Sequence, residues 1–438
     1  MTGASASGIT VDPLTSRVAG FPAHPGRSAA IAEVHSRPPP LLASPRVLVQ
    51  LAFMTEGNSA ADTAAITDLC RRLGEAPPHE AERHYVLRSG AGTLHWERHS
   101  EFSTYMWESP LVPWEHWKNN SPFNDGFLPP GPLMSGVRLE LLQAGPDTTL
   151  PDFGLDRESL CHSVVEDGNA SILTDFRQDP DGLTRMFILD RGLSESRRGV
   201  LAQRLIEIET YRVFCMLGLT LAQSLSGELR RMEDDLVKLT DAVRITEPDD
   251  SDALLGRLTI LAAELEAQAA SSLFRFGASR AYYDIVMERL QALKEVPYEG
   301  ADSWSQFLVR RVAPAMRTCR SVQDRQENLS RKLARTTQLL RTSVEVEVEK
   351  QNRNLLASMN ERARLQLRLQ QTVEGLSVAA ISYYVVGLAS YMLAGLPAMP
   401  GWLPPKSILA IAVPLVVLAI WLVVRRIRRK HTADLEVK

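Results

Sequence analysis

Two long stretches near the C-terminus contain no charged residue, and they constrain the fold more than any other feature. They are residues 376–396 (LSVAAISYYVVGLASYMLAGL) and residues 407–424 (SILAIAVPLVVLAIWLVV). As α-helices they would be roughly 31 and 27 Å long, which matches the hydrocarbon core of a bilayer. The sequence therefore predicts two transmembrane helices. The alternative, a buried hairpin in a soluble domain, is disfavoured because a basic cluster follows the second stretch.

Basic residues flank both predicted spans on the same side. Arg362, Arg364 and Arg368 precede the first span, and the tail, residues 425–438, opens with a run of arginines. The connecting loop, residues 397–406, contains one lysine. Because basic flanks stay in the cytoplasm, we expect a two-pass protein of the cytoplasmic (inner) membrane. Both termini would be cytoplasmic and the loop would lie outside.

The formal net charge of −3 conceals an asymmetry along the chain. Residues 1–302 carry a net charge of −15, whereas residues 303–438 carry +12. An acidic head argues against nucleic acid as a partner, because it repels phosphates. The basic half is suited to contact membrane lipid with anionic headgroups. The N-terminus shows no signal-peptide pattern, and the 4 scattered cysteines fit a reducing compartment.

The chain before the spans divides by composition and periodicity. Residues 1–30 are rich in Ser, Gly, Ala and Pro, and we expect them to be disordered. An α/β or α+β cytoplasmic domain is predicted over residues 31–192. It rests on a helix at 59–73 that Gly74 ends, and on strands at 46–55, 85–88, 93–101, 137–143, 170–176 and 184–189.

Helical periodicity continues after residue 193. Residues 193–301 form a helical section, with predicted helices at 197–243, 251–276 and 279–294. Residues 302–375 form a long, coiled-coil-like stalk helix, which Pro314 interrupts. Beyond Pro314 this stalk would be roughly 90 Å long. Because so long a helix needs partners, we expect it to pack on the helices of the head, on other copies in a homo-oligomer, or on both.

The predicted fold class combines these parts. It is an α+β cytoplasmic head followed by a helical section, a long stalk helix and two C-terminal transmembrane helices.

The segment HWERHSEF contains the most conspicuous polar pattern. In a strand, two histidines and two glutamates fall on one face: His95, Glu97, His99 and Glu101. The opposite face carries the apolar Leu94, Trp96 and Phe102. The polar face can bind a divalent cation or supply an acid and a base. The alternative, which we favour, is the solvated polar face of a half-buried strand.

Two further polar groups have competing interpretations. His35 and Arg37 precede three prolines, and Arg37 either binds an anion or, as we favour, braces the turn against a neighbouring acid. The acidic segment 247–252 either binds a cation or caps the next helix. The cap is favoured because the spacing of a calcium loop is absent.

Hydroxyl groups in the first predicted span prefer a helix partner to lipid tails. They are candidates for a helix interface or a pore lining: Ser382, Tyr383, Tyr384, Ser390 and Tyr391.

Motifs for nucleotide binding and hydrolysis are missing from the sequence. It contains no GxxxxGK[ST], no GxGxxG after a strand, no GxSxG and no HExxH. This absence leans against an enzyme. The sequence leaves the cofactor unidentified, and a divalent cation is the candidate that it offers.

Several segments together resemble one family. They are HSRPPPLL, RVLVQLAF, HWERHSEFSTY, RLIEIETYR and QLRLQQTVEGLSVAAISYYVVGL. Here the sequence resembles a bacterial family of uncharacterised membrane-anchored proteins, the domain of unknown function 3422, from about His24 to Arg429. The resemblance implies a membrane anchor and supplies no catalytic residues.

The order of the predicted parts also resembles that of CorA-type magnesium transporters, which are pentameric channels. Those proteins carry Gly-Met-Asn at the outer end of the first span, where this chain has LAGLPAMPG at residues 393–401. The resemblance therefore implies a shared plan without the loop that selects hydrated magnesium.

Three functional hypotheses follow. We favour a membrane-anchored oligomer without enzymatic activity, whose head binds a ligand or a cytoplasmic protein partner. The second is a CorA-like pentameric divalent-cation channel or transporter whose first span lines a pore through Ser382, Tyr383 and Ser390. The third is a membrane-tethered metal-dependent enzyme that uses His95, Glu97, His99 and Glu101.

Overall fold

The computed structural model describes residues 17–27, 30–31, 38–79, 82–124, 126–145, 153–245, 250–395 and 405–433. These residues belong to two compact units. Unit 1 takes its described residues from 1–245 and 253–336, and unit 2 takes them from 246–252 and 337–438.

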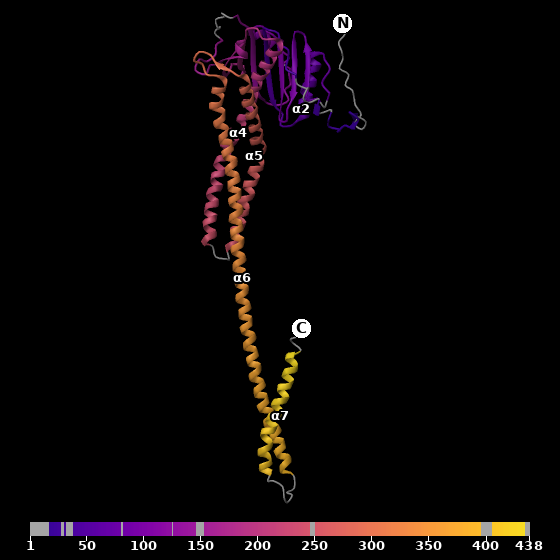
Figure 1. Ribbon diagram of the computed structural model, residues 1–438, viewed down its shortest axis with the longest axis vertical. Coiled ribbons are helices and arrows are strands. Elements are labelled where there is room, and N and C mark those ends of the chain that lie inside the picture. Colours follow the sequence, from indigo (N-terminus) through magenta and orange to yellow (C-terminus); the bar gives the residue numbers. More distant parts are fainter. Residues whose placement is uncertain are drawn as a thin grey trace. The chain divides into compact units, whose positions relative to one another are not determined.

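Unit 1 is built on a nine-stranded sheet (Figure 1). The strand order is β11-β8-β9-β10-β7-β3-β6-β5-β4. Neighbouring strands are antiparallel except for β10 and β7, which are parallel. The strands are β3 (Arg46–Met54), β4 (His84–Ser89), β5 (Gly92–Arg98), β6 (Phe102–Pro110), β7 (Leu133–Gln143), β8 (Cys161–Val165), β9 (Ala170–Gln178), β10 (Thr184–Asp190) and β11 (Val296–Pro297).

The helices are α2 (Ser59–Leu73), α3 (Trp114–Asn120), α4 (Glu195–Ile245), α5 (Ser251–Leu293), α6 (Trp304–Ala394) and α7 (Pro405–Ala433). A short 3-10 turn, η1, covers Glu166–Gly168. A separate hairpin of β1 (Arg17–Val18) and β2 (Phe21–Pro22) lies within the segment expected to lack structure. A mixed α+β sheet domain followed by long helices is therefore the observed fold class.

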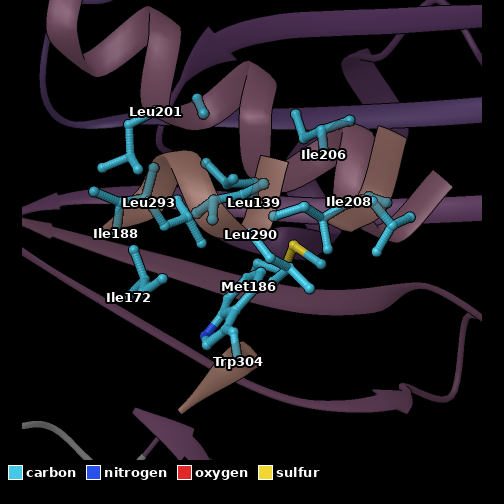
Figure 2. Close-up of a cluster of buried hydrophobic side chains, with 14 of the residues drawn as sticks. Leu139, Ile172, Met186, Ile188, Leu201, Ile206, Ile208, Leu290, Leu293 and Trp304 are labelled. Carbon is cyan, nitrogen blue, oxygen red and sulfur yellow. The ribbon is translucent and has the colours of Figure 1, made fainter. Parts of the chain in front are cut away.

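One face of the sheet is covered by α4, α5 and the first part of α6. Figure 2 shows the centre of this core, where strand residues such as Ile172 and Met186 meet Leu201 of α4, Leu290 of α5 and Trp304 of α6. Fully burying an apolar side chain of this size stabilises the fold by roughly 1.5–3 kcal/mol. Because alternate strand residues point to the same face, they form one apolar surface, and helices from distant parts of the sequence pack on it.

The other face of the sheet is covered by α2 and α3. The carboxylate of Asp62, in the first turn of α2, accepts hydrogen bonds from Trp96 Nε1 (3.2 Å), Tyr105 OH (2.9 Å) and Arg98 Nε (2.8 Å). Three donors satisfy this buried carboxylate, because burying an unpaired charge would be costly. Asp62 therefore attaches the start of α2 to the sheet.

The predicted helix at 59–73 agrees with α2, which ends at Leu73. Gly74 follows it in the left-handed conformation, with φ of 77°. Other boundaries were wrong. Residues 251–293 form the single helix α5 rather than two helices, and α6 continues through Pro314 without a break. Proline removes only one backbone hydrogen bond from the helix, and packing on the head maintains the rest.

The apolar stripe at the start of α6 packs within unit 1. Cys319, Val322, Leu329 and Leu333 are buried. Polar contacts on the same helix hold it to α4 and α5. Arg325 pairs with Glu233 of α4 at 2.7 Å, and Ser330 Oγ donates to Glu266 of α5 at 2.8 Å. The heptad-like spacing thus reflects contacts within the head up to residue 336.

Unit 2 contains the later part of α6 and α7. Among the described residues, α6 is the helix with a stretch long and apolar enough to cross a membrane, and only 6% of that stretch is buried. The second predicted span lies in α7. It does not meet the same criterion in its described residues, and the side chains of residues 408 and 409 lie outside them. The structure therefore provides one candidate span where the sequence predicted two.

Candidate functional site

A small polar cavity lies between the sheet and α4 in unit 1. Its volume is about 50 Å³, which is room for a few water molecules. Strands β3, β4, β5 and β6 form one wall, α4 forms the opposite wall, and two prolines close one side. The lining residues are Pro38, Pro40, Gln50, His84, His95, Glu97, His99, Phe102, Thr104, Met106, Gln203, Ile206, Glu207, Thr210 and Tyr211.

Strand pairing gathers the polar residues of the sheet wall. His84 of β4 lies opposite Glu97 of β5, and Glu97 lies opposite Thr104 of β6. Alternation along β5 turns Leu94 and Trp96 into the core beneath α2, so His95 and Glu97 face the cavity. Three of the four residues in the predicted polar face therefore line one cavity, namely His95, Glu97 and His99.

His95 is the cavity residue with the strongest electrostatic perturbation. Burial, with smaller contributions from His84 and Arg88, lowers the pKa of His95 from 6.5 to about 4. Its imidazole is therefore neutral at pH 7 and offers one donor and one acceptor. The His95 backbone pairs within the sheet, but its imidazole has no hydrogen-bond partner among the described residues, so both ring nitrogens remain available to a molecule in the cavity.

The α4 wall is polar, and its groups are held in place. Gln203 Nε2 donates to Glu207 at 2.9 Å, and Arg289 Nε of α5 donates to the same carboxylate at 2.5 Å. Gln50 Nε2 of β3 donates to Thr210 Oγ1 at 2.9 Å. These bonds fix the side chains before any ligand arrives, which lowers the entropy cost of binding.

Glu101 does not share the cavity, because β5 ends at Arg98 and the chain turns into β6 at Phe102. The prediction of a strand through residue 101 was therefore wrong. Phe102 was also misplaced, since it lies on the cavity side and stacks on His99 with ring centroids 4.2 Å apart. The turn, which shifts the alternation, explains both errors.

The carboxylate of Glu101 instead forms a buried ion pair with α5. It accepts hydrogen bonds from Arg275 Nη1 at 3.0 Å, Arg275 Nη2 at 2.6 Å and Tyr282 OH at 2.7 Å. Its backbone carbonyl accepts from the amides of Thr55 and Glu56. Glu101 thus joins the β5–β6 turn, the loop before α2 and helix α5.

A larger cavity of about 420 Å³ lies beside the first and shares His99, Phe102 and Tyr211 with it. Arg83 and Arg98 also line this space. Tyr211 stacks on Tyr282 with ring centroids 5.4 Å apart. A ligand larger than a few atoms could therefore extend from the His95 cavity into this neighbouring space.

The polar face does not form a recognisable metal site in the described part of the chain. No group of three or more His, Cys, Asp or Glu side chains there is arranged to hold a metal ion. His99 Nε2 lies 3.7 Å from a carboxylate oxygen of Glu97, an ion-pair distance when the imidazole is protonated. The cavity is better suited to hydrogen bonding than to ligating a cation.

The remaining sequence-predicted site residues are placed as follows. His35 and Arg37 lie outside the described residues, as do residues 247–249 of the acidic segment 247–252. In unit 2, Ser382 is 6% exposed, whereas Tyr383, Tyr384 and Tyr391 are 69–81% exposed. Ser390 Oγ donates to the carbonyl of Gly387 at 2.8 Å. These hydroxyls therefore point in different directions around α6.

The family described as "Protein of unknown function (DUF3422)" matches residues 22–431. The chain belongs to this family. No curated protein matches it. The matched residues of this DUF3422 protein include parts of both units.

Several cavity residues of this DUF3422 chain were not singled out in the sequence. His84 could have been found, because the short hairpin loop after residue 89 aligns it with Glu97. Gln203 and Glu207 could not, because polar residues on a long amphipathic helix usually face solvent. Their role depends on which face of α4 meets the sheet.

Proposed function

We propose that this protein is a membrane-anchored oligomer whose cytoplasmic head binds a small polar ligand in the cavity between the sheet and α4. The observation that carries the proposal is His95, whose neutral and unpartnered imidazole faces a cavity with fixed polar walls. Polar ligands are recognised by a few well-placed hydrogen-bonding groups of this kind.

The membrane anchor is proposed from two features of unit 2. The stretch in α6 is apolar and only 6% of it is buried, which suits contact with lipid rather than with a protein core. Arginines flank it at residues 362–368 and follow the second predicted span at residues 425–429. A two-pass arrangement in the inner membrane with a cytoplasmic head satisfies both.

Oligomer formation is proposed along the part of α6 beyond residue 336. Leu355, Leu356 and Met359 there are 57–64% exposed. Exposed apolar side chains repeated along a helix indicate a contact surface. A second copy of the same helix would cover these side chains. Light scattering of the detergent-solubilised protein tests this, and a monomer would contradict the proposal.

A second candidate is a CorA-like divalent-cation channel or transporter. It is favoured by the continuity of α6, which runs as one helix from the head into the apolar stretch. Ion flux into proteoliposomes tests it directly. Flux no greater than in empty vesicles, for several divalent cations, would contradict this candidate.

The ligand proposal is tested with the small molecules that co-purify with the full chain. Protein is purified under native conditions and denatured, and the released compounds are identified by mass spectrometry. His95→Leu removes the free imidazole, whereas His116→Leu changes an exposed histidine on α3 as a matched control. We expect a compound that is released from the wild type and the control but not from His95→Leu. Identical profiles for all three proteins would contradict the proposal.

A further inference from the structure

A second cavity in unit 1 lies between α5 and the first part of α6. Its volume is about 160 Å³, which is room for several water molecules or for a small anion. The lining residues are spaced three or four apart along each helix, so they lie on the facing sides of the two helices. They are Phe276, Arg280 and Tyr283 of α5 and Ala313, Met316, Arg317, Cys319, Arg320 and Gln323 of α6. This cavity shares no lining residue with the cavity around His95.

Three arginines from two helices line this cavity, and its described lining residues include no carboxylate. Arg280 Nη2 donates to the neutral amide oxygen Oε1 of Gln323 at 2.7 Å, which connects the two walls. The guanidinium groups of Arg317 and Arg320 have no hydrogen-bond or ion-pair partner in the described part of the chain. The cavity therefore concentrates three positive charges that no carboxylate in its wall offsets.

Other arginines on the same two helices are paired with acids. Arg275, Arg289 and Arg325 each contact a glutamate at 2.5–2.7 Å. Asp284 and Asp324 are the carboxylates closest along the helices to the cavity arginines. Neither of them lines the cavity, and neither forms an ion pair with an arginine in the described part of the chain. The unpaired arginines are thus an exception on these helices, and an anion would supply the missing partner.

The uncharged groups of the cavity are also suited to an anion. The hydroxyl of Tyr283 is a further donor without a partner among the described residues. Since Oε1 of Gln323 already accepts from Arg280, the same amide offers its Nε2 as a donor. Phe276 and Cys319 are only 1% and 2% exposed, and they make part of the wall apolar. An apolar wall strengthens the attraction between a guanidinium and an anion relative to open water.

We propose that this cavity binds a phosphate group. Arginine suits this role because its planar fork donates two hydrogen bonds to one phosphate. A phosphate group has more oxygen acceptors and more negative charge than a single carboxylate, so it matches three guanidinium groups better. The site is separate from the His95 cavity, and the proposal therefore goes beyond the proposed function and does not depend on it.

Isothermal titration calorimetry of the full chain in detergent and phosphate-free buffer tests this site. The probes are inorganic phosphate, dihexanoyl phosphatidic acid and acetate. We expect the wild type to bind phosphate more tightly than acetate. The double variant Arg317→Gln, Arg320→Gln should bind phosphate on the order of 100-fold more weakly, because it loses two charged donors. Replacing the same two arginines by lysine keeps the charge and should leave the affinity within about tenfold of the wild type, which separates charge loss from misfolding.

A matched control changes two exposed arginines elsewhere on the same helices, as Arg257→Gln, Arg335→Gln. We expect this control to bind phosphate as the wild type does. Binding of phosphatidic acid alone, lost in the Arg317→Gln, Arg320→Gln variant, would support the site and identify a lipid headgroup as the source of the phosphate. Absence of binding for both phosphate compounds, acetate binding as tight as phosphate binding, or an equal loss in the control would overturn the proposal.

Discussion

The carboxylate of Glu101 accepts a 2.6 Å hydrogen bond from the guanidinium of Arg275, although 174 residues separate them in the sequence. Glu101 is 2% exposed, so water cannot replace its partner. The ion pair lies next to Phe102 and Tyr282, close to the residues that line the candidate site. It connects the turn at the end of β5 to α5, and so it holds the sheet wall against the helices.

Removing one partner of this pair should destabilise unit 1 strongly. Arg275→Ala leaves the Glu101 carboxylate buried without its cation, which typically costs about 3–5 kcal/mol. Urea unfolding of the full chain in detergent measures the loss. The exposed pair of Lys238 and Asp235 provides the control, because Asp235→Asn should change stability by less than about 1 kcal/mol. Similar effects of the two substitutions would contradict this account.

Two glycines of α4 should respond in opposite ways to alanine. A methyl group at Gly199 would meet the carbonyl oxygen of Pro40 at 1.6 Å, whereas nothing lies within 4 Å of one at Gly227. Gly199→Ala must therefore displace the segment that closes the cavity. We expect the free energy of unfolding to fall by several kcal/mol, as it does for a severe packing defect in a protein core. Gly227→Ala should stabilise the helix by up to about 1 kcal/mol. Thermal unfolding that ranks the two variants in the reverse order would contradict the packing described here.

Acid should destabilise unit 1 through two histidines. Burial lowers the pKa of both His95 and His162 to about 4. Between pH 6.5 and pH 4 the unfolded chain binds protons that the folded chain does not, so stability falls as the pH falls through this window. His95 accounts for on the order of 3 kcal/mol.

Substituting these histidines tests the sign of the effect. The double variant His95→Leu, His162→Phe should show a flatter dependence of unfolding free energy on pH between 4 and 6.5. Above pH 7 both proteins should have the same slope. An unchanged slope in the acidic window would show that the two imidazoles do not titrate as inferred.

The four cysteines should be unreactive in the folded protein. All are buried and free. Burial raises the pKa of Cys70 to about 11 and those of Cys161 and Cys215 to about 12, and it also raises the pKa of Cys319. Because the thiolate is the reactive form, a thiol reagent at pH 8 should label none of them until the chain is unfolded. Rapid labelling of the native protein would contradict their burial.

Local patterns predicted much of the fold. The helix at 59–73 was correct because Gly74 provides an unambiguous end, and alternation located β5 and the residues on its cavity face. The end of β5 was not predictable, because it depends on the pairing of β6 with β3, a contact between distant segments. The helical wall of the cavity was missed for the same reason, because the periodicity of the α4 sequence does not reveal that Gln203 and Glu207 face the sheet.

The proposed function depends most on the topology of the chain, because it requires a head on the cytoplasmic side of two membrane spans. Single-cysteine labelling in intact bacterial cells with a membrane-impermeant maleimide measures it. Ala398→Cys reports on the loop between the spans and Thr432→Cys on the tail, while the unsubstituted chain controls for the native cysteines.

We predict that Ala398→Cys is labelled in intact cells and that Thr432→Cys is labelled only after the membrane is permeabilised. Labelling of Thr432→Cys in intact cells, or recovery of the protein in the soluble fraction, would contradict the account.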